Sequence, residues 1–475
     1  MPPPDAPHAE KSNRYSRRLA LAVQLHFAAM VAFTSWAFGG QIPWARDVIA
    51  VLGGVGVVLF LAACRQARRG RLLAHPALRL LWPLWLYDVL VIASCFNPAF
   101  RETVVGGERI LILRDTLPWL PTGARPALAI KELWQFNGIV LSAFNLLLAL
   151  NRRSQIRTLL FFFAGNAMAL AIFGTLQKLS GASGLWFGLV PSPQKYFFST
   201  FVYHNHWGAF ILLNTAACLA LCFHFLREHR GRDLWHSPVP TGSVATLLLA
   251  AAVPLSASRS ATGLMIVLLL FAGVHLIRLI ARRRPGSAGP AIAGIVTAAT
   301  LAVATIGYLG RDVITQRLQL TTEQLAYLAR EDSLNAREIL YRDTWRMAME
   351  RPWFGWGLES YAHTFRIFNT QRAIESVFWI PFYAEAHSDW LQSLAEVGFV
   401  GTALLVTLGL LPLWRHRRRL GATPVPRYLL TGAGLLLLYA WLEFPFANPA
   451  VMMMFCGLWC LAARHLQLDE VHGHD

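Results

Sequence analysis

Charged residues are scarce in this chain. Only 15% of its 475 residues are Asp, Glu, Lys or Arg, whereas a soluble globular domain carries about 25%. The shortage extends along the whole length, which excludes a water-soluble globular enzyme and an intrinsically disordered protein. Cysteine is also scarce, at six residues, so a disulfide-stabilised scaffold is excluded. No Cys/His cluster has the spacing of a zinc site, and we expect neither a metal nor a cofactor.

What the chain has instead is long apolar runs. Hydrophobic residues make up 55% of the sequence, and about 20 consecutive apolar residues suffice for a helix to cross a bilayer. The runs predict an all-α polytopic membrane protein with about twelve transmembrane helices. The predicted spans are 19–38, 45–64, 79–97, 128–150, 157–177, 203–225, 242–257, 261–280, 289–309, 391–414, 428–444 and 447–463.

Basic residues collect in alternate gaps between these spans. The second gap reads RQARRGR and the tenth reads RHRRR, while the intervening gaps carry few or mixed charges. Because cytoplasmic loops of membrane proteins are rich in Lys and Arg, we expect both tails, 1–18 and 464–475, in the cytoplasm. The net charge of +17 is then a matter of topology, and nucleic-acid binding is not needed to explain it.

Two segments on the opposite side are long. Residues 98–127 contain four prolines and are predicted to form a partly ordered loop. Residues 310–390 form a water-exposed lid between the group of spans at 19–309 and the group at 391–463. A helix is predicted within the lid over 335–349, and the prolines and glycines of R-P-W-F-G-W-G end it.

Three arginines are candidates for binding an anion. Arg259 lies in S-A-S-R-S at a span boundary, where arginine is costly unless it is paired or faces a polar cavity. Its planar guanidinium suits phosphate or carboxylate, although snorkelling to the interface would also explain it. Arg337 shares a helix face with Tyr341, and Arg342 lies on another face. A solvated amphipathic helix would explain the lid arginines equally well.

His387 is the candidate general base. It lies in A-E-A-H-S-D-W just before the tenth span, and a histidine with a pKa near ~6.5 can accept a proton at neutral pH. Glu385, Asp389 or Glu396 would orient it. The alternative is an ordinary surface histidine.

Other polar residues stand at membrane boundaries. His204, Asn205 and His206 open the sixth span in Y-H-N-H-W, where hydrogen-bonding groups at a helix start are favoured over metal ligands. Lys195 precedes them and could meet an anion. The acids expected to form structural pairs with outward arginines are Asp88, Glu132 and Glu443.

These motifs carry a resemblance. The chain resembles the O-antigen ligase and polymerase superfamily of bacterial inner-membrane proteins in its span count and large outward loop between spans nine and ten. The motifs that carry the likeness are S-A-S-R-S, F-V-Y-H-N-H-W-G-A-F, A-R-E-I-L-Y-R-D-T-W-R-M-A-M-E-R-P-W-F-G-W-G and H-S-D-W-L-Q-S-L-A-E-V-G-F-V-G. They run in the family's order over residues 160–410.

The resemblance implies a metal-independent, inverting glycosyltransferase with a GT-C-like fold. It would take a glycan from undecaprenyl diphosphate at the periplasmic face of the inner membrane and pass it to lipid A–core or another glycan. Arg259 and either Arg337 or Arg342 would bind the diphosphate, and His387 would take the proton from the acceptor hydroxyl.

Several alternatives stay open. The superfamily includes ligases, polymerases and protein O-oligosaccharyltransferases, and a ligase-like activity is slightly favoured. A secondary transporter would show repeated halves, which the sequence lacks, but a flippase for a lipid-linked glycan is harder to exclude. A transferase using a polyprenyl monophosphate donor is disfavoured, since the first outward loop is poor in acidic residues.

Overall fold

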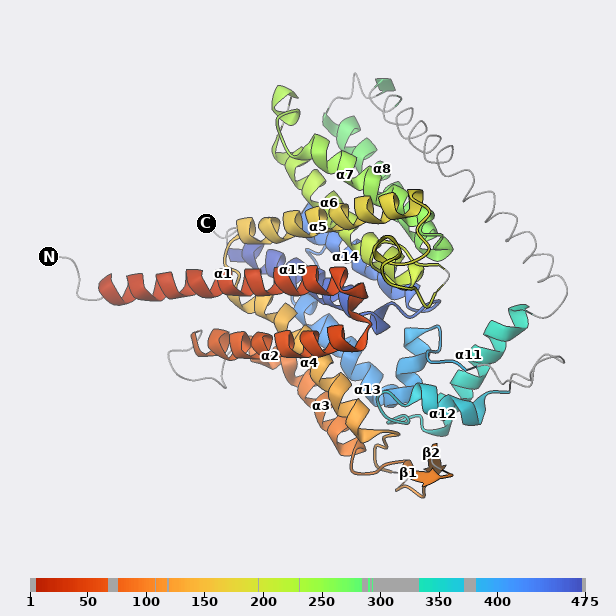
Figure 1. The fold of residues 1–475 in the computed structure, drawn as a ribbon. Helices are drawn as coiled ribbons and strands as arrows, with labels where there is room; N and C mark the ends of the chain where they lie inside the picture. The colour runs from red at the N-terminus through yellow and green to blue at the C-terminus, as the bar shows by residue number, and fades with distance from the viewer. Residues whose placement is uncertain are drawn as a thin grey trace.

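The chain folds as a helical bundle with one small sheet (Figure 1). The computed structural model describes residues 6–66, 76–106, 108–117, 119–194, 196–229, 231–283, 289–290, 293, 333–370 and 382–471. Most of the predicted ninth span and two parts of the predicted lid, 310–332 and 371–381, lie outside the described residues.

Eleven of the twelve predicted spans correspond to described helices, and the helices at 333–350 and 361–368 are two further helices of the predicted lid. The described α-helices are thirteen in number. They are α1 (Ala6–Trp36), α2 (Pro43–Gln66), α3 (Trp82–Ser94), α4 (Pro126–Ala149), α5 (Arg153–Leu179), α6 (His204–Glu228), α7 (Val239–Leu255), α8 (Arg259–Arg283), α11 (Ser333–Glu350), α12 (Tyr361–Phe368), α13 (Asp389–Trp414), α14 (Pro424–Tyr439) and α15 (Pro449–Val471). Helix α11 confirms the helix predicted at 335–349.

Seven of these helices are long and apolar enough to cross a bilayer, namely α1, α2, α5, α6, α8, α13 and α15. The protein is therefore a multi-pass membrane protein. The predicted spans at 79–97, 128–150, 242–257 and 428–444 correspond to α3, α4, α7 and α14, which are not among the seven. Helix α7, for example, has 17 residues, fewer than the ~20 that span a bilayer at right angles.

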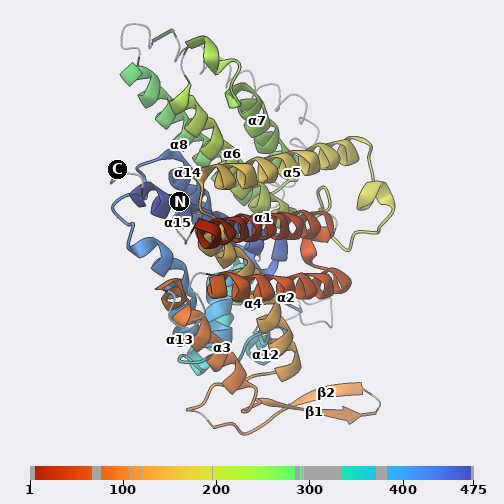
Figure 2. The same ribbon diagram turned by 90° about the vertical axis from the view of Figure 1, so that its left-hand side faces the viewer.

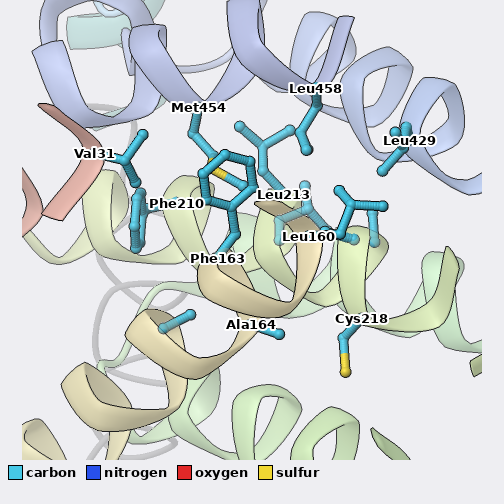
Figure 3. Packing of buried hydrophobic residues seen from close by; sticks show 14 of the residues in the cluster. Val31, Leu160, Phe163, Ala164, Phe210, Leu213, Cys218, Leu429, Met454 and Leu458 are labelled. Atoms are coloured by element: carbon cyan, nitrogen blue, oxygen red, sulfur yellow. The ribbon is translucent and has the colours of Figure 1, made fainter. Parts of the chain in front are cut away.

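Helix α6 lies at the centre of the bundle. In the most apolar 18-residue stretch of α6, 83% of the residues are buried, whereas only 17% are buried in the corresponding stretch of α8 at the periphery. Figure 3 shows Phe210 and Leu213 of α6 packed between side chains of α5 and α15. Close packing against α14 depends on Gly432, because an added Cβ there would lie 2.4 Å from the Ala216 Cβ. Small residues at such contacts are the usual device of helices packed within membranes.

The segment between α3 and α4 differs from its prediction. The loop expected over 98–127 contains a hairpin, in which β1 (Phe100–Val105) pairs antiparallel with β2 (Glu108–Leu113). The turn between the strands contains Gly106 at φ +61°, a conformation that glycine adopts without steric cost. The four prolines obscured short strands in which β-branched residues are frequent.

The start of α1 and the end of α15 lie at the end of the bundle opposite α11 and α12. In Figure 1, α1 begins at the end that is remote from the β-hairpin, α11 and α12, and Figure 2 looks onto that end. The end of α15 lies near the start of α5, since Asp469 Oδ1 is 2.7 Å from Arg153 Nη2. Asn151, just before α5, donates to Ser16 Oγ of α1 at 3.4 Å.

Helix α13 is broken near its start, and a loop of the lid binds to the backbone at the break. Gly398 has φ +67° and ψ −172°, far from helical values. The loop at 352–357 runs along the break and supplies partners for its backbone groups. The bonds are Phe399 N to Pro352 O (2.7 Å), Val400 N to Trp353 O (3.1 Å), Trp356 N to Ala395 O (2.9 Å) and Gly357 N to Glu396 O (2.7 Å). Unpaired backbone groups are costly in a bilayer, so this loop and the break depend on each other.

Candidate active site

Glu443 is the centre of a polar cluster at the lid end of the bundle. It lies in the turn between α14 and α15, and its side chain is only 4% exposed. One carboxylate oxygen, Oε1, is 3.4 Å from Arg337 Nη2 on α11. The other, Oε2, accepts a hydrogen bond from the Tyr203 hydroxyl (3.3 Å) and lies 3.7 Å from His387 Nδ1. A buried carboxylate thus joins three segments that are far apart in sequence.

His387 is held in an unusual backbone conformation. Its φ is +51°, a region that costs roughly 1–2 kcal/mol for residues other than glycine. The following residue, Ser388, accepts a hydrogen bond from Leu391 N and so caps α13. On the other side, the Tyr341 hydroxyl donates to the His387 carbonyl oxygen at 3.0 Å. Strained residues of this kind are frequent at functional sites, and here the strain aims the imidazole at Glu443.

Phe444 packs against three aromatic rings of the cluster. Tyr203 stacks on it with centroids 5.4 Å apart, and the rings of His206 and His387 lie perpendicular to it with centroids 5.1 Å and 4.9 Å away. The His387 side chain remains 31% exposed. The ring orientation is therefore fixed while access from outside is kept.

A chain of hydrogen bonds links Glu443 to the start of α8. The Tyr203 hydroxyl accepts from Asn205 Nδ2 (2.8 Å), and Asn205 Oδ1 accepts from the Ser258 hydroxyl (2.7 Å). Ser258 is fully buried and directly precedes Arg259, the first residue of α8, which is exposed. The sequence motifs around residues 203–206 and 256–260 are thus parts of one network.

The two lid arginines point to different partners. Arg337 meets Glu443, whereas Arg342 Nε lies 3.7 Å from Asp343 Oδ1 and its Nη2 donates to Thr370 Oγ1. The predicted shared face of Arg337 and Tyr341 is confirmed, because both side chains reach the Glu443–His387 region. Of the two candidates, Arg337 is the one beside His387.

The prediction that Glu385, Asp389 or Glu396 orients His387 is wrong. Glu385 Oε2 accepts from Gln392, Asp389 Oδ2 accepts from Phe446 N, and Glu396 Oε1 accepts from Tyr361 N. The acid near the imidazole is Glu443, 56 residues further along the chain. Sequence reasoning treated it only as an acid paired with arginine, and that pairing is confirmed.

The remaining predictions at span boundaries have mixed outcomes. Glu132 pairs with Arg46 at 2.8 Å as expected, but Asp88 accepts from Asn137 and not from an arginine. His204 and His206 are hydrogen-bonding groups as predicted, with ring nitrogens 3.2 Å from the Tyr196 oxygen and 3.1 Å from the Phe444 oxygen. Lys195 lies outside the described residues. Among the described residues, no cluster of three or more His, Cys, Asp or Glu could hold a metal ion.

The charges of the cluster support an ionised Glu443. Burial disfavours its charged form, but the neighbouring His387 and Arg337 outweigh burial and lower the pKa of Glu443. Burial raises the pKa of the Tyr203 hydroxyl, which keeps it a hydrogen-bond donor. In this cluster the imidazole of His387 faces the carboxylate of Glu443, and the guanidinium of Arg337 is exposed enough to meet a ligand from outside.

This pKa shift predicts how stability responds to acid. A carboxylate with a lowered folded-state pKa contributes stability above its unfolded pKa of about 4.3, and this contribution is lost as the pH falls through the folded-state value. We expect the thermal midpoint of the wild type to fall more steeply between pH 5 and pH 3 than that of Glu443→Gln. Melting curves of both proteins in the same detergent test this, and parallel pH profiles would contradict it.

Comparison with known sequences finds one family for part of the chain. Residues 244–406 match the O-antigen ligase family. This segment is similar to the O-antigen ligase family. The matched range includes Arg259, Arg337, Arg342 and His387, while Tyr203 and Glu443 lie outside it. The curated proteins include no match to the chain.

Proposed function

We propose that this protein is an O-antigen ligase-like transferase, which moves a glycan from undecaprenyl diphosphate to an acceptor hydroxyl. The observation that carries the proposal is the placement of His387 beside buried Glu443, with Arg337 on the same carboxylate, within and around the segment that matches the O-antigen ligase family. A polymerase that extends the glycan uses the same chemistry and is the second candidate.

The reaction is a single displacement. His387 takes the proton of the acceptor hydroxyl as the oxygen attacks the anomeric carbon, the bond from that carbon to the diphosphate oxygen breaks, and the diphosphate leaves with the electron pair. Glu443 stabilises the imidazolium that forms. Arg337 and Arg259 neutralise the charge that grows on the diphosphate, a contribution that is usually large in such reactions. Attack from the side opposite the leaving group inverts the anomeric centre, and the arginines supply the positive charge without a metal.

We place the active site at the periplasmic face of the bacterial inner membrane, with both termini in the cytoplasm. Support comes from the bundle, because α1 begins and α15 ends at the end remote from the lid (Figure 1). Basic residues lie at the same end, because Arg153 pairs with Asp469 near the end of α15 and Arg283 donates to the backbone oxygens of Leu226 and Arg227 near the end of α6. Cytoplasmic ends of membrane proteins are rich in such residues.

The decisive experiment is turnover in nanodiscs. Purified protein receives an undecaprenyl-diphosphate-linked glycan in the presence of EDTA, with either lipid A–core or a second copy of the lipid-linked repeat as acceptor. Product with the first acceptor supports a ligase, and product with the second supports a polymerase. If the donor binds but neither acceptor reacts, the proposed ligase or polymerase activity is wrong.

The two lid arginines give a matched comparison. They lie on the same helix, and their side chains are 58% and 56% exposed. We expect Arg337→Ala to reduce the transfer rate about 10- to 100-fold by weakening diphosphate stabilisation, and Arg342→Ala to reduce it less than about threefold. Steady-state rates at saturating donor measure both, and a larger loss in Arg342→Ala would move the diphosphate to the other face of α11.

A further inference from the structure

A second polar feature of the molecule lies between α6, α8 and α14, at the opposite end of α14 from Glu443. Its centre is His275 of α8, whose ring stacks on that of Phe223 of α6 with centroids 4.5 Å apart. The His275 ring also reaches α14, with Nδ1 2.9 Å from the Tyr428 hydroxyl and Nε2 2.9 Å from Arg427 Nη1. One imidazole therefore joins three helices.

The hydrogen bonds of His275 show that its ring is neutral. Arginine only donates hydrogen bonds, so Nε2 accepts from Arg427 and the ring proton lies on Nδ1, which faces the Tyr428 hydroxyl. A neutral imidazole directs the guanidinium but does not balance its charge. Arg427 also donates twice to the Gly421 carbonyl oxygen. Three of its five N–H groups are used in this way, and the other two have no partner among the described residues.

Two further guanidinium groups act on the His275 ring. They belong to Arg227 at the end of α6 and to Arg278 on α8. In the part of the chain that the structure describes, none of the three arginines forms an ion pair with a carboxylate. Glu228, which follows Arg227, pairs with an arginine of α5 at 3.7 Å instead. Three positive charges thus gather around one neutral ring, and we call Arg227, Arg278, Arg427 and His275 the basic cluster.

The basic cluster lies where the apolar side chains of α8 give way to charged ones. All exposed residues of α8 between 266 and 274 are apolar, namely Ile266, Val267, Leu270, Phe271 and Val274. Of these, Val267, Phe271 and Val274 share a helix face with exposed Arg278, and we call these three the apolar stripe. Such a face passes from hydrocarbon to head groups, and an arginine at that boundary is costly unless it is paired.

We propose that the basic cluster binds the head group of an anionic phospholipid. The phosphate lies among Arg227, Arg278 and Arg427, and one acyl chain runs along the apolar stripe. The guanidinium groups supply charge-assisted hydrogen bonds, and basic sites between transmembrane helices hold lipid head groups in this way. The inference is independent of the proposed function, because the basic cluster lies at the far end of the bundle from His387.

A free anion is the alternative source of the same phosphate chemistry. The apolar stripe favours the lipid, because it continues the face of Arg278 with the surface that an acyl chain covers. A bilayer also holds its phosphates at the level of Arg278, whereas a free phosphate loses its translational freedom on binding. The occupant is therefore a lipid and not a dissolved anion.

The test counts lipids that stay bound to the full chain. Purified protein in detergent receives phosphatidylglycerol or phosphatidylcholine with the same acyl chains, and native mass spectrometry measures the affinity for each. Inorganic diphosphate serves as the free anion. All samples contain about 0.15 M ammonium acetate, at which exposed charges more than about 8 Å apart are largely screened.

Three single variants change the net charge by the same amount. Arg278→Gln alters an exposed side chain, so the packing of the helices is kept, and Arg427→Gln removes the guanidinium beside His275. Arg65→Gln is the matched control. Arg65 is exposed in the last turn of α2 at the same end of the bundle, and α1 lies between α2 and α8 (Figure 2).

We expect the wild type to bind phosphatidylglycerol at least about tenfold more tightly than phosphatidylcholine. Arg278→Gln and Arg427→Gln should each weaken phosphatidylglycerol binding about tenfold, because each removes a hydrogen bond to a charged group. Arg65→Gln should weaken it less than about twofold. Diphosphate should bind at least about tenfold more weakly than phosphatidylglycerol.

Three results would overturn the inference. Equal affinity of the wild type for the two lipids would reject the selection of an anionic head group. Equal losses in Arg65→Gln and Arg278→Gln would reject the basic cluster as the site, because general attraction to the basic end of the bundle would then explain the binding. Diphosphate that binds as tightly as phosphatidylglycerol, with the same loss in Arg278→Gln, would reject the lipid as the occupant.

Discussion

Replacing His387 with alanine is expected to lower the rate of glycan transfer by a factor of about 10²–10⁴, the usual contribution of a positioned general base. A sugar hydroxyl is a poor nucleophile until its proton is removed, and His387 is the titratable group that Glu443 and Phe444 hold in a fixed orientation. Donor binding should change little, since the arginines remain. Single-turnover rates and donor affinity, measured separately, test both statements.

The backbone conformation of His387 determines which variant is the matched control for His387→Ala. At φ +51°, alanine is strained, whereas asparagine tolerates this region well. His387→Asn therefore keeps the local conformation and removes the base, and it should be as inactive as His387→Ala. Glu443→Gln keeps the shape of its side chain but not the charge, and we expect an intermediate loss with an altered pH–rate profile. Transfer by His387→Asn at the wild-type rate would exclude His387 as the base.

The parts of the fold that depend on local pattern were predictable. Apolar runs of span length located eleven of the described helices, and polar periodicity located α11 within two residues at its start and one at its end. The exception is the hairpin at 100–113, where prolines outweighed short strand signals. Length and hydropathy are properties of a segment by itself, so one sequence suffices to read them.

The relations between segments were not predictable in the same way. His387, Arg337 and Tyr203 stood out as polar residues at membrane boundaries or beside a motif, but nothing in their spacing shows that all three meet Glu443. The nearer acids Glu385 and Asp389 were the natural partners of His387 by sequence distance. A left-handed residue at 387 turns its side chain away from those of its neighbours, and a positive φ at a histidine has no sequence signature.

The break in α13 was equally hidden, because L-A-E-V-G-F-V-G reads as the continuous start of an apolar helix. In the structure, Gly398 ends one helical segment and starts another, and the backbone of 352–357 occupies the gap. A glycine inside an apolar run is consistent with a helix, a kink or a close contact. Only the four hydrogen bonds to the lid loop decide between them.

This break gives the second large expected effect. Gly398→Ala should detach the lid loop, because the residue has φ +67° and an added Cβ would lie 2.4 Å from the backbone carbon and oxygen of Trp353. Left-handed strain of roughly 1–2 kcal/mol and overpacking of about 1–3 kcal/mol together predict a loss of transfer of about 100-fold or more, as Arg337 on the lid leaves His387. Hydrogen exchange should rise at Trp356 and Gly357, whose amides donate to the carbonyl oxygens of Ala395 and Glu396 in the wild type. Gly409→Ala on the same helix is the control, because its added Cβ meets no atom within 4 Å. If Gly398→Ala matched Gly409→Ala in exchange and in rate, the lid would be held by other contacts and the break in α13 would be incidental to the site.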